Sequence, residues 1–206
     1  MNDSSENTIA TPSRPLSPRV SFMPPKPIVI IGLMGCGKTS IGKRIAKRFE
    51  LQFCDSDQEV EAAAGCSVSD IDSIYGEGAF QNGEYRVLSR ILSQTIQVIA
   101  TGCLSFTYES TRQLMKEKAI SVWLKADLQT LLLRVTGRKD RPLLEVGKEE
   151  EILIDLIDKY YPIFSESDVC VQTYDEPANI TVDRVIIAMS EFIQANYPDH
   201  HVLKSV

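Results

Sequence analysis

The chain has 206 residues, of which 43% are hydrophobic and 24% are charged, as is typical of one soluble globular domain. Its formal net charge of −6 argues against broad, sequence-independent binding to nucleic acid, which depends on lysine and arginine. No apolar run approaches the roughly 18 residues that a membrane span needs. We therefore expect neither a nucleic acid nor a membrane as a partner.

The cysteines are scattered, odd in number and without the spacing of metal ligands, so we expect no disulfide framework and no zinc site. This usage is typical of a reducing compartment, and a cytoplasmic location follows as the expectation. The five cysteines are Cys36, Cys54, Cys66, Cys103 and Cys170.

The first 25 residues contain five of the ten prolines and many serines, without the apolar centre of a signal peptide. Such a segment buries too little surface to offset the entropy of ordering, so we expect a disordered tail over 1–25. The predicted domain covers 26–197, and a short second tail follows over 198–206.

From residue 26 onward, short β-branched runs alternate with longer segments of helical period. This alternation predicts an α/β fold with a central five-stranded parallel sheet between two layers of helices. The strands are expected at 27–31, 51–54, 97–101, 119–124 and 169–172. Helices are expected at 38–49, 58–64, 77–92, 108–118, 128–136, 149–160 and 180–194.

The run GLMGCGKT at 32–39 fits G-x-x-x-x-G-K-S/T and lies between a predicted strand and a predicted helix, which is the context that the phosphate-binding P-loop requires. The glycines allow the backbone to curl so that several N–H groups point at phosphate oxygens, and the helix N-terminus adds a favourable dipole. The predicted nucleotide-binding residues of this loop are Gly32, Gly35, Cys36, Gly37, Lys38 and Thr39.

The same loop also predicts a position for Mg²⁺ beside the bound nucleotide. We expect this nucleotide to be ATP. The Thr39 hydroxyl is expected to contact the ion, and an acidic residue at the end of a neighbouring strand would hold its water shell. Asp55 follows the second predicted strand and is positioned for this. Thr39 and Asp55 are thus the predicted metal residues.

The segment 137–147, GRKDRPLLEVG, interrupts the helical pattern with glycine, proline and a cluster of charges. Three cations in this stretch of an acidic protein favour a lid that faces an anion over an ordinary surface loop.

Several motifs in this order resemble shikimate kinase, a family of P-loop enzymes similar in fold to nucleoside monophosphate kinases. They are GLMGCGKTSIGKRIA at 32–46, FCDSD at 53–57, G-E-x-x-F-x-x-x-E-x-x-V-L at 76–88, RPLL at 141–144 and YPIFSESD at 161–168. The resemblance implies transfer of the γ-phosphoryl group of ATP to the 3-hydroxyl of shikimate, a step in aromatic amino-acid biosynthesis.

The resemblance also implies roles for individual residues. Asp57 would hydrogen-bond the acceptor hydroxyls and help to take the proton of the attacking one, while Arg141 would reach the phosphates from the lid. Arg134 and Pro177 would sandwich the adenine. Together with Lys38 of the P-loop, Asp57 and Arg141 are the expected catalytic residues.

On the acceptor side the chain departs from the family pattern. Gln81 follows Phe80 where the family has arginine, although Glu84 remains, and Tyr160 replaces a second arginine. The family's glycine triplet reads Gly102-Cys103-Leu104. Asp72 stands where an apolar wall residue is expected. The expected acceptor residues are Asp57, Phe80, Gln81, Glu84, Gly102, Cys103, Leu104 and Tyr160.

These departures leave alternatives open. The chain could phosphorylate shikimate detectably, use another hydroxylated acceptor, or be a catalytically weak or silent relative. It could also be a nucleotide-binding module whose lid closure serves a protein partner. An open acceptor cavity favours a kinase, whereas a pocket filled by Leu104 and Tyr160 favours the module. We expect a monomer.

Overall fold

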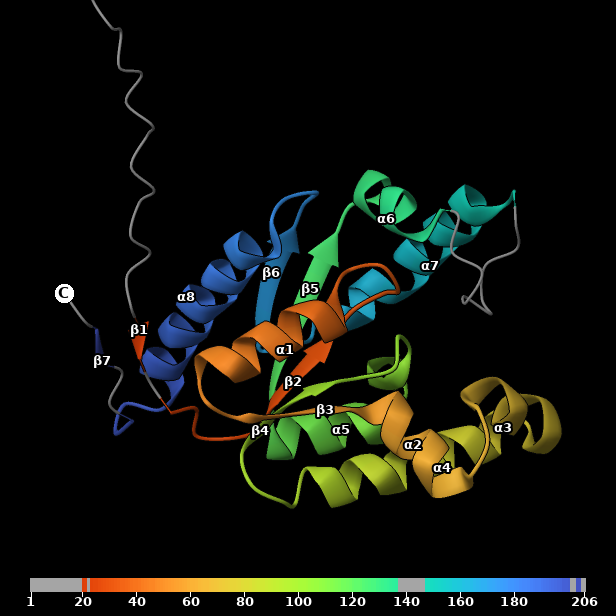
Figure 1. Cartoon of the computed structure of the whole chain (residues 1–206), viewed down its shortest axis with the longest axis horizontal. Helices are drawn as coiled ribbons and strands as arrows, with labels where there is room; N and C mark the ends of the chain where they lie inside the picture. The colour runs from red at the N-terminus through yellow and green to blue at the C-terminus, as the bar shows by residue number, and fades with distance from the viewer. Residues whose placement is uncertain (1–19, 22, 137–146, 201–202, 205–206) are drawn as a thin grey trace, which may run out of the picture.

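The computed structural model describes residues 20–21, 23–136, 147–200 and 203–204 (Figure 1). A five-stranded parallel sheet runs in the order β3-β4-β2-β5-β6. Its strands are β2 (Ile28–Ile31), β3 (Gln52–Asp55), β4 (Gln97–Ala100), β5 (Ile120–Ala126) and β6 (Val169–Thr173). This arrangement confirms the predicted fold, with strand ends within two residues of those expected from the sequence.

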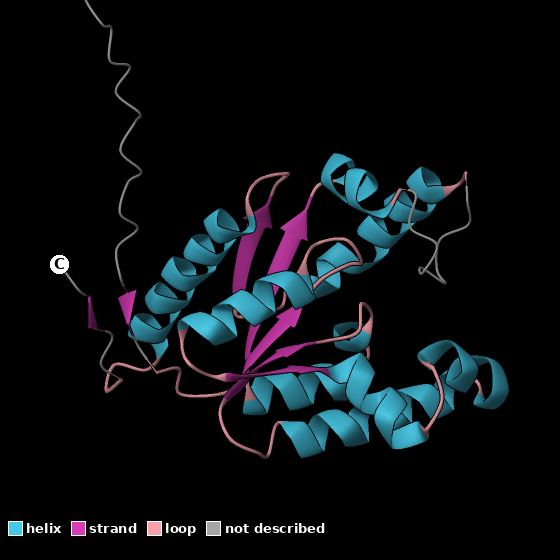
Figure 2. Ribbon diagram, viewed as in Figure 1, coloured by secondary structure: helices cyan, strands magenta, loops and turns pink. Residues whose placement is uncertain are grey.

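Helices cover both faces of the sheet and make three layers (Figure 2). Helices α1 (Lys38–Arg48) and α8 (Ala178–Asn196) pack against each other over one face, while α5 (Glu109–Lys118) and the end of α7 (Glu149–Phe164) cover the other. All four residues of β2 are buried, because parallel strands between two helical layers have apolar neighbours on both sides.

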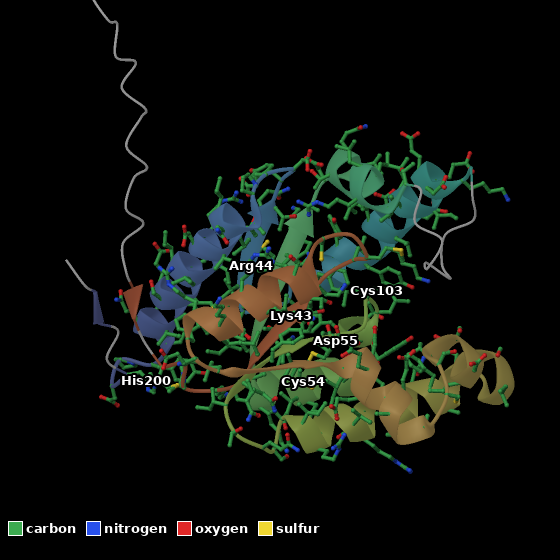
Figure 3. All side chains as sticks on the ribbon, viewed as in Figure 1. Lys43, Arg44, Cys54, Asp55, Cys103 and His200 are labelled. Carbon is green, nitrogen blue, oxygen red and sulfur yellow. The ribbon has the colours of Figure 1, made fainter. Side chains whose placement is uncertain are left out.

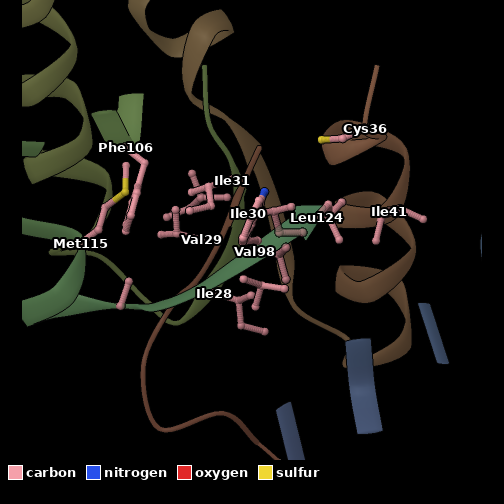
Figure 4. Close-up of a cluster of buried hydrophobic side chains, with 14 of the residues drawn as sticks. Ile28, Val29, Ile30, Ile31, Cys36, Ile41, Val98, Phe106, Met115 and Leu124 are labelled. Carbon is pink, nitrogen blue, oxygen red and sulfur yellow. The ribbon is translucent and has the colours of Figure 1, made fainter. Parts of the chain in front are cut away.

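The core therefore has two halves divided by β2 (Figure 4). Val29 lies on the side of Phe106 and Met115, whereas Ile30 lies on the side of Ile41 of α1. This alternation follows from the two-residue period of a strand.

A group of three helices extends beyond the sheet edge at β3: α2 (Ser56–Ala64), α3 (Val68–Tyr75) and α4 (Glu77–Ile91). Helix α3 was not predicted, because its sequence VSDIDSIY gives only about two turns in which a helical period can be recognised. It packs on α4 and α2. The remaining elements are η1 (Ser105–Thr107) and α6 (Leu128–Val135).

Helix α7 runs past the position where the sequence predicts its end. The predicted helix ends at residue 160, two residues before Pro162, and proline removes a backbone donor and clashes with the preceding turn. The helix instead includes Pro162 in its last turn and ends at Phe164. Phe164 is fully buried, with its ring centroid 5.9 Å from that of Trp123 and 6.4 Å from that of Phe106. Packing of the Phe164 ring therefore outweighs the tendency of Pro162 to end the helix.

Two short strands, β1 (Val20–Ser21) and β7 (Leu203–Lys204), pair antiparallel and join segments predicted as tails. The predicted domain boundaries at 25 and 197 remain predictions. The greater part of the predicted lid, with Arg141, and the side chain of Asp72 lie outside the described residues. Among the described helices, none combines the length and apolar character that a bilayer crossing requires.

The packing of Phe164 predicts a large loss of stability on truncation. Phe164→Ala should lower the free energy of unfolding by about 3–5 kcal/mol, because a large cavity is left between α7 and β5. Ile154→Ala on the same helix is the control, since Ile154 is 41% exposed and its truncation should cost about 0.5 kcal/mol. Urea unfolding of both variants measures the difference, and equal losses would contradict this packing account.

Candidate active site

The P-loop curls between the buried end of β2 and the start of α1. Gly37 caps α1 in the left-handed region, with φ 104°. Gly35 has φ 82°, and a Cβ added there would lie 2.8 Å from Cγ1 of Val135. The positive φ values and the contact with Val135 both disfavour a side chain at these positions. The turn therefore keeps the bare backbone that lets a ligand approach closely, as the motif predicts.

Lys38 begins α1 and its ammonium group lies over the loop. Its Nζ donates hydrogen bonds to the carbonyl oxygens of Gly32 at 2.8 Å and Leu33 at 3.2 Å. Lys38 and Thr39 line two separate cavities at once. The lysine therefore stands where these two cavities meet.

The first cavity, of about 460 Å³, lies between the P-loop, α6 and the start of α8. It is lined by Gly35, Cys36, Gly37, Lys38, Thr39, Ser40, Ile41, Arg134, Thr173, Asp175, Glu176, Ala178 and Thr181. We call it the nucleotide cavity, because backbone N–H groups at a helix N-terminus favour phosphate. Gly32 and Pro177 do not line it.

Arg134 of α6 links the two sides of the nucleotide cavity. Its Nη1 donates to the carbonyl oxygens of Gly35 and Cys36, each at 3.3 Å, and its Nη2 donates to the carbonyl oxygen of Tyr174. The guanidinium plane is thus held at the wall of this cavity, where a flat base can stack on it.

Thr39 and Asp55 face each other between β3 and α1. The Thr39 hydroxyl donates to Oδ2 of Asp55 at 3.0 Å, and Figure 3 shows Asp55 at the end of β3. Within the described residues there is no group of three or more His, Cys, Asp or Glu side chains that would hold a metal by themselves. One hydroxyl and one carboxylate nevertheless fit Mg²⁺, which keeps several waters and takes its other ligands from phosphates.

The second cavity, of about 800 Å³, opens on the other side of Lys38, between α2, α3, α4 and the loop after β4. We call it the acceptor cavity, because most of the residues expected to bind the acceptor line it. Its volume lies in the range of about 300–1,000 Å³ that is usual for small-molecule sites. Its lining residues are Met34, Lys38, Thr39, Asp55, Asp57, Val68, Ser69, Glu77, Phe80, Glu84, Thr101, Gly102, Cys103, Leu104, Ser105 and Tyr108.

Two carboxyl groups in this cavity have raised pKa values. Burial, followed by the charge of Asp55, raises the pKa of Asp57 to about 6, although Lys38 opposes the shift. Burial also raises the pKa of Glu84 to about 7, with the Ser105 hydrogen bond opposing it and the charge of Asp57 adding to it. A Cβ on Gly102 would lie 2.7 Å from Oδ1 of Asp57 and 3.0 Å from Oε1 of Glu84. Only glycine allows the two carboxyls to flank the backbone there.

Six of the eight acceptor residues expected from the sequence line this cavity, namely Asp57, Phe80, Glu84, Gly102, Cys103 and Leu104, whereas Gln81 and Tyr160 do not. The Gln81 amide donates instead to Oε1 of Glu77 at 3.0 Å, one turn earlier on α4. Tyr160 packs its ring 5.0 Å from the ammonium group of Lys159. Leu104 forms part of the wall and leaves the cavity open.

Sequence reasoning missed several lining residues. Val68 and Ser69 belong to helix α3, which was not predicted. Two signals could have found them: the helical spacing of Val68 and Ile71, and the expectation that Asp72 in the same segment stands at the wall of the site. Thr101, Ser105 and Tyr108 follow β4 directly, and the rule that ligands bind beyond the carboxyl ends of parallel strands could have found them.

The profile described as shikimate kinase matches residues 34–190. The chain belongs to the shikimate kinase family. A shikimate kinase from Paramagnetospirillum magneticum is 43% identical over 178 residues, covering 86% of this chain and 91% of its own. A shikimate kinase from Rhodopseudomonas palustris is 38% identical over 195 residues, which cover 93% of this chain and 96% of that protein.

Solved structures of shikimate kinases share the architecture. The shikimate kinase from Acinetobacter baumannii, solved in complex with shikimate, has a TM-score of 0.74 and 29% identity, covering 84% of this chain and 94% of that one. A gluconokinase from Sinorhizobium meliloti, at 17% identity and a TM-score of 0.57, shares the fold alone.

The raised pKa of Glu84 predicts a pH-dependent stability. The folded protein holds this proton more tightly than the unfolded chain, whose carboxyl has the ordinary pKa of 4.5. The resulting stabilisation is complete below pH 4.5 and is lost as the pH rises through 7. Relative to Glu84→Gln, which cannot ionise, the wild type should lose about 2 kcal/mol of unfolding free energy between pH 5 and pH 8.

Denaturant unfolding across this pH range measures the effect. Only the slope of the difference is informative, because the glutamine amide also changes the local hydrogen bonding at every pH. Parallel stability profiles for the two proteins would show that Glu84 keeps an ordinary pKa.

Proposed function

We propose that this protein transfers the γ-phosphoryl group of ATP to the 3-hydroxyl of shikimate, in the biosynthesis of aromatic amino acids. The observation that carries the proposal is that the nucleotide cavity and the acceptor cavity meet at Lys38 and Thr39. A phosphate bound on the P-loop and a hydroxyl bound beside Asp57 would therefore face each other across one lysine. Phosphoryl transfer depends mainly on such positioning and on charge neutralisation.

Each residue has a defined task in this proposal. The backbone N–H groups of the P-loop bind the phosphates, and Lys38 turns its ammonium group from the loop carbonyls to the β- and γ-phosphates. Thr39 and Asp55 hold Mg²⁺, which neutralises phosphate charge when bound. Asp57, with its pKa near 6, is largely ionised at neutral pH and accepts the proton of the attacking hydroxyl.

Arg134 stacks on the base in this proposal, and Pro177 at the start of α8 remains its proposed partner. Arg141 belongs to the segment outside the described residues, and its approach to the phosphates is carried over from the family pattern. We further infer a cytoplasmic location, since all five cysteines are free thiols. A monomer remains part of the proposal.

We also propose that turnover of shikimate is impaired, because Gln81 and Tyr160 replace the two arginines of the family pattern and Cys103 and Leu104 replace glycines. A charge-assisted hydrogen bond contributes about 1.5–3 kcal/mol, so two such losses weaken binding by about two to four orders of magnitude. The open acceptor cavity supports a kinase over a nucleotide-binding module that serves a protein partner.

An ADP-release assay with Mg²⁺ and ATP tests the proposal directly. Shikimate should stimulate ADP formation in a saturable manner, with a KM well above that of a family member that has both arginines. An absence of stimulation at saturating shikimate would contradict phosphorylation of shikimate. Turnover equal to that of an ordinary family member would contradict the proposed impairment and leave the proposed phosphoryl transfer intact.

The phosphate-binding role of Lys38 is tested by calorimetry with Mg-ATP. Lys38→Ala should weaken ATP binding by about ten- to a hundredfold, the loss of a charge-assisted hydrogen bond to phosphate. Lys43→Ala is the control, because Lys43 lies on the same helix with its Nζ 5.6 Å from the centre of the Phe53 ring and lines neither cavity. Equal ATP affinities for the two variants would refute the assignment.

A further inference from the structure

Tyr108 brings a phenol group to the wall of the acceptor cavity, where the proposed reaction has not yet used it. The residue directly precedes α5 and lines the cavity together with Glu77 and Glu84 of α4. It is only partly buried, so a ligand in the cavity can reach it. Burial, followed by the charges of Glu77 and Glu84, raises the pKa of Tyr108 to about 12. The phenol therefore keeps its proton at neutral pH and can donate a hydrogen bond.

The side chain of Gln81 holds the phenolic oxygen of Tyr108. Burial is the main cause of the raised pKa of Tyr108, whereas a hydrogen bond with the Gln81 side chain acts in the opposite direction, as a donor to the phenolic oxygen does. An amide has two N–H hydrogens, and Gln81 also donates to Oε1 of Glu77 at 3.0 Å. Because Gln81 supplies a hydrogen to the phenolic oxygen, the hydroxyl hydrogen of Tyr108 remains available for a ligand.

Tyr108 lies at the end of the acceptor cavity that is remote from the nucleotide. Besides burial, the main cause in each case, Lys38 lowers the pKa of Asp57, and Asp57 raises the pKa of Glu84. The charged groups that act on the pKa of Tyr108 are Glu77 and Glu84, and neither Lys38 nor Asp57 is among them. Since such effects fall with distance, these cavity residues form a row that starts at Lys38 and ends at Tyr108. An acceptor whose reacting hydroxyl lies beside Asp57 therefore extends towards Tyr108.

Both positions at which the chain lacks a family arginine adjoin Tyr108. Gln81 hydrogen-bonds the phenol from α4, and Tyr160 of α7 is among the groups that raise its pKa. Neither Gln81 nor Tyr160 lines the acceptor cavity, whereas Tyr108 does. An acceptor carboxylate at this end therefore meets a phenol in place of arginine. Glu84 nearby is about half protonated at pH 7, because burial raises its pKa to about 7, and this limits its repulsion of a carboxylate.

We propose that Tyr108 binds the carboxylate of the acceptor and that Gln81 is the positioning residue that orients the phenol. This inference rests on the proposed function, since it concerns the acceptor of the same phosphoryl transfer. The reacting hydroxyl lies beside Asp57 and Lys38, and the carboxylate, which projects from the ring away from that hydroxyl, accepts a hydrogen bond from the Tyr108 hydroxyl. One neutral donor in place of two arginines fits the weakened binding proposed above.

Tyr108→Phe removes only the phenolic hydroxyl and tests the contact directly. In calorimetry with Mg²⁺ and a non-hydrolysable ATP analogue, the variant should bind shikimate about ten- to a hundredfold more weakly than the wild type, the effect of losing a hydrogen bond to a charged group. Its affinity for the ATP analogue should not change. Tyr85→Phe is the control, since Tyr85 lies on α4, is 38% exposed and lines neither cavity.

A second probe shows which part of the acceptor Tyr108 contacts. This probe is the analogue of shikimate that has hydrogen in place of the carboxylate. It should bind the wild type and Tyr108→Phe with the same affinity, which is lower than that of the wild type for shikimate. Equal affinities of the two proteins for shikimate, or an equal loss of affinity for both probes, would overturn the inference.

Gln81→Met tests the positioning role, because methionine keeps the length of the side chain and removes the amide. It should weaken shikimate binding about two- to tenfold in the wild-type background, since the phenol loses the donor that orients it. In the Tyr108→Phe background the same substitution should have no effect, because no phenolic oxygen is left to orient. Equal losses in the two backgrounds would show that Gln81 does not act through Tyr108.

Turnover separates this inference from the proposed function. If Tyr108→Phe weakens shikimate binding but neither protein releases ADP in response to shikimate, the assignment of Tyr108 stands and the proposed phosphoryl transfer fails. If both proteins phosphorylate shikimate with the same KM, the proposed transfer stands and the assignment is wrong. If the wild type does not bind shikimate, both are wrong.

Discussion

The turn between β2 and α1 has to bring backbone N–H groups and one lysine to a single point at the end of a buried strand. The rest of the site depends on this constraint. Gly35 and Gly37 adopt positive φ values that side chains resist, and Gly35 also packs where a Cβ would touch Val135. Because β2 is buried between two helical layers, the turn cannot shift without disturbing the core, and Lys38 is held where the two cavities meet.

The two cavities are chemically different. The nucleotide cavity has P-loop backbone, Arg134 and the N-terminal end of α1, all of which favour an anion. The acceptor cavity has two buried carboxyls with raised pKa values around a glycine that leaves no room for a side chain. Phosphoryl transfer needs the first environment at the donor. The second environment is the one in which we propose that the acceptor binds. Among the residues that line it, Cys103 and Leu104 depart from the family pattern.

Much of the fold follows from the sequence. The five β-branched runs and the helical segments between them predict the sheet, and the motif at 32–39 predicts the phosphate turn. Where local sequence patterns predicted the wrong helix boundary, tertiary packing determined the observed one. Pro162 indicated a helix end, but burial of Phe164 carries α7 one turn further.

The acceptor side was harder to predict, because its walls come from segments distant in sequence. Helix α3 has only eight residues, and the helical spacing of Val68 and Ile71 within it is too brief to stand out, so Val68 and Ser69 were missed. The direction of the Gln81 amide depends on Glu77, and the place of the Tyr108 phenol beside that amide depends on the packing of α5 on α4. Neither fact can be read from residue spacing.

The central claim is that the two cavities are the donor and acceptor halves of one site joined at Lys38. A crystal structure with Mg²⁺, a non-hydrolysable ATP analogue and a hydroxylated ring acceptor tests it most directly. The account predicts the γ-phosphate beside Lys38 and an acceptor hydroxyl between that phosphate and Asp57. A nucleotide bound away from the P-loop, or an acceptor bound outside the cavity lined by Asp57 and Glu84, would contradict it.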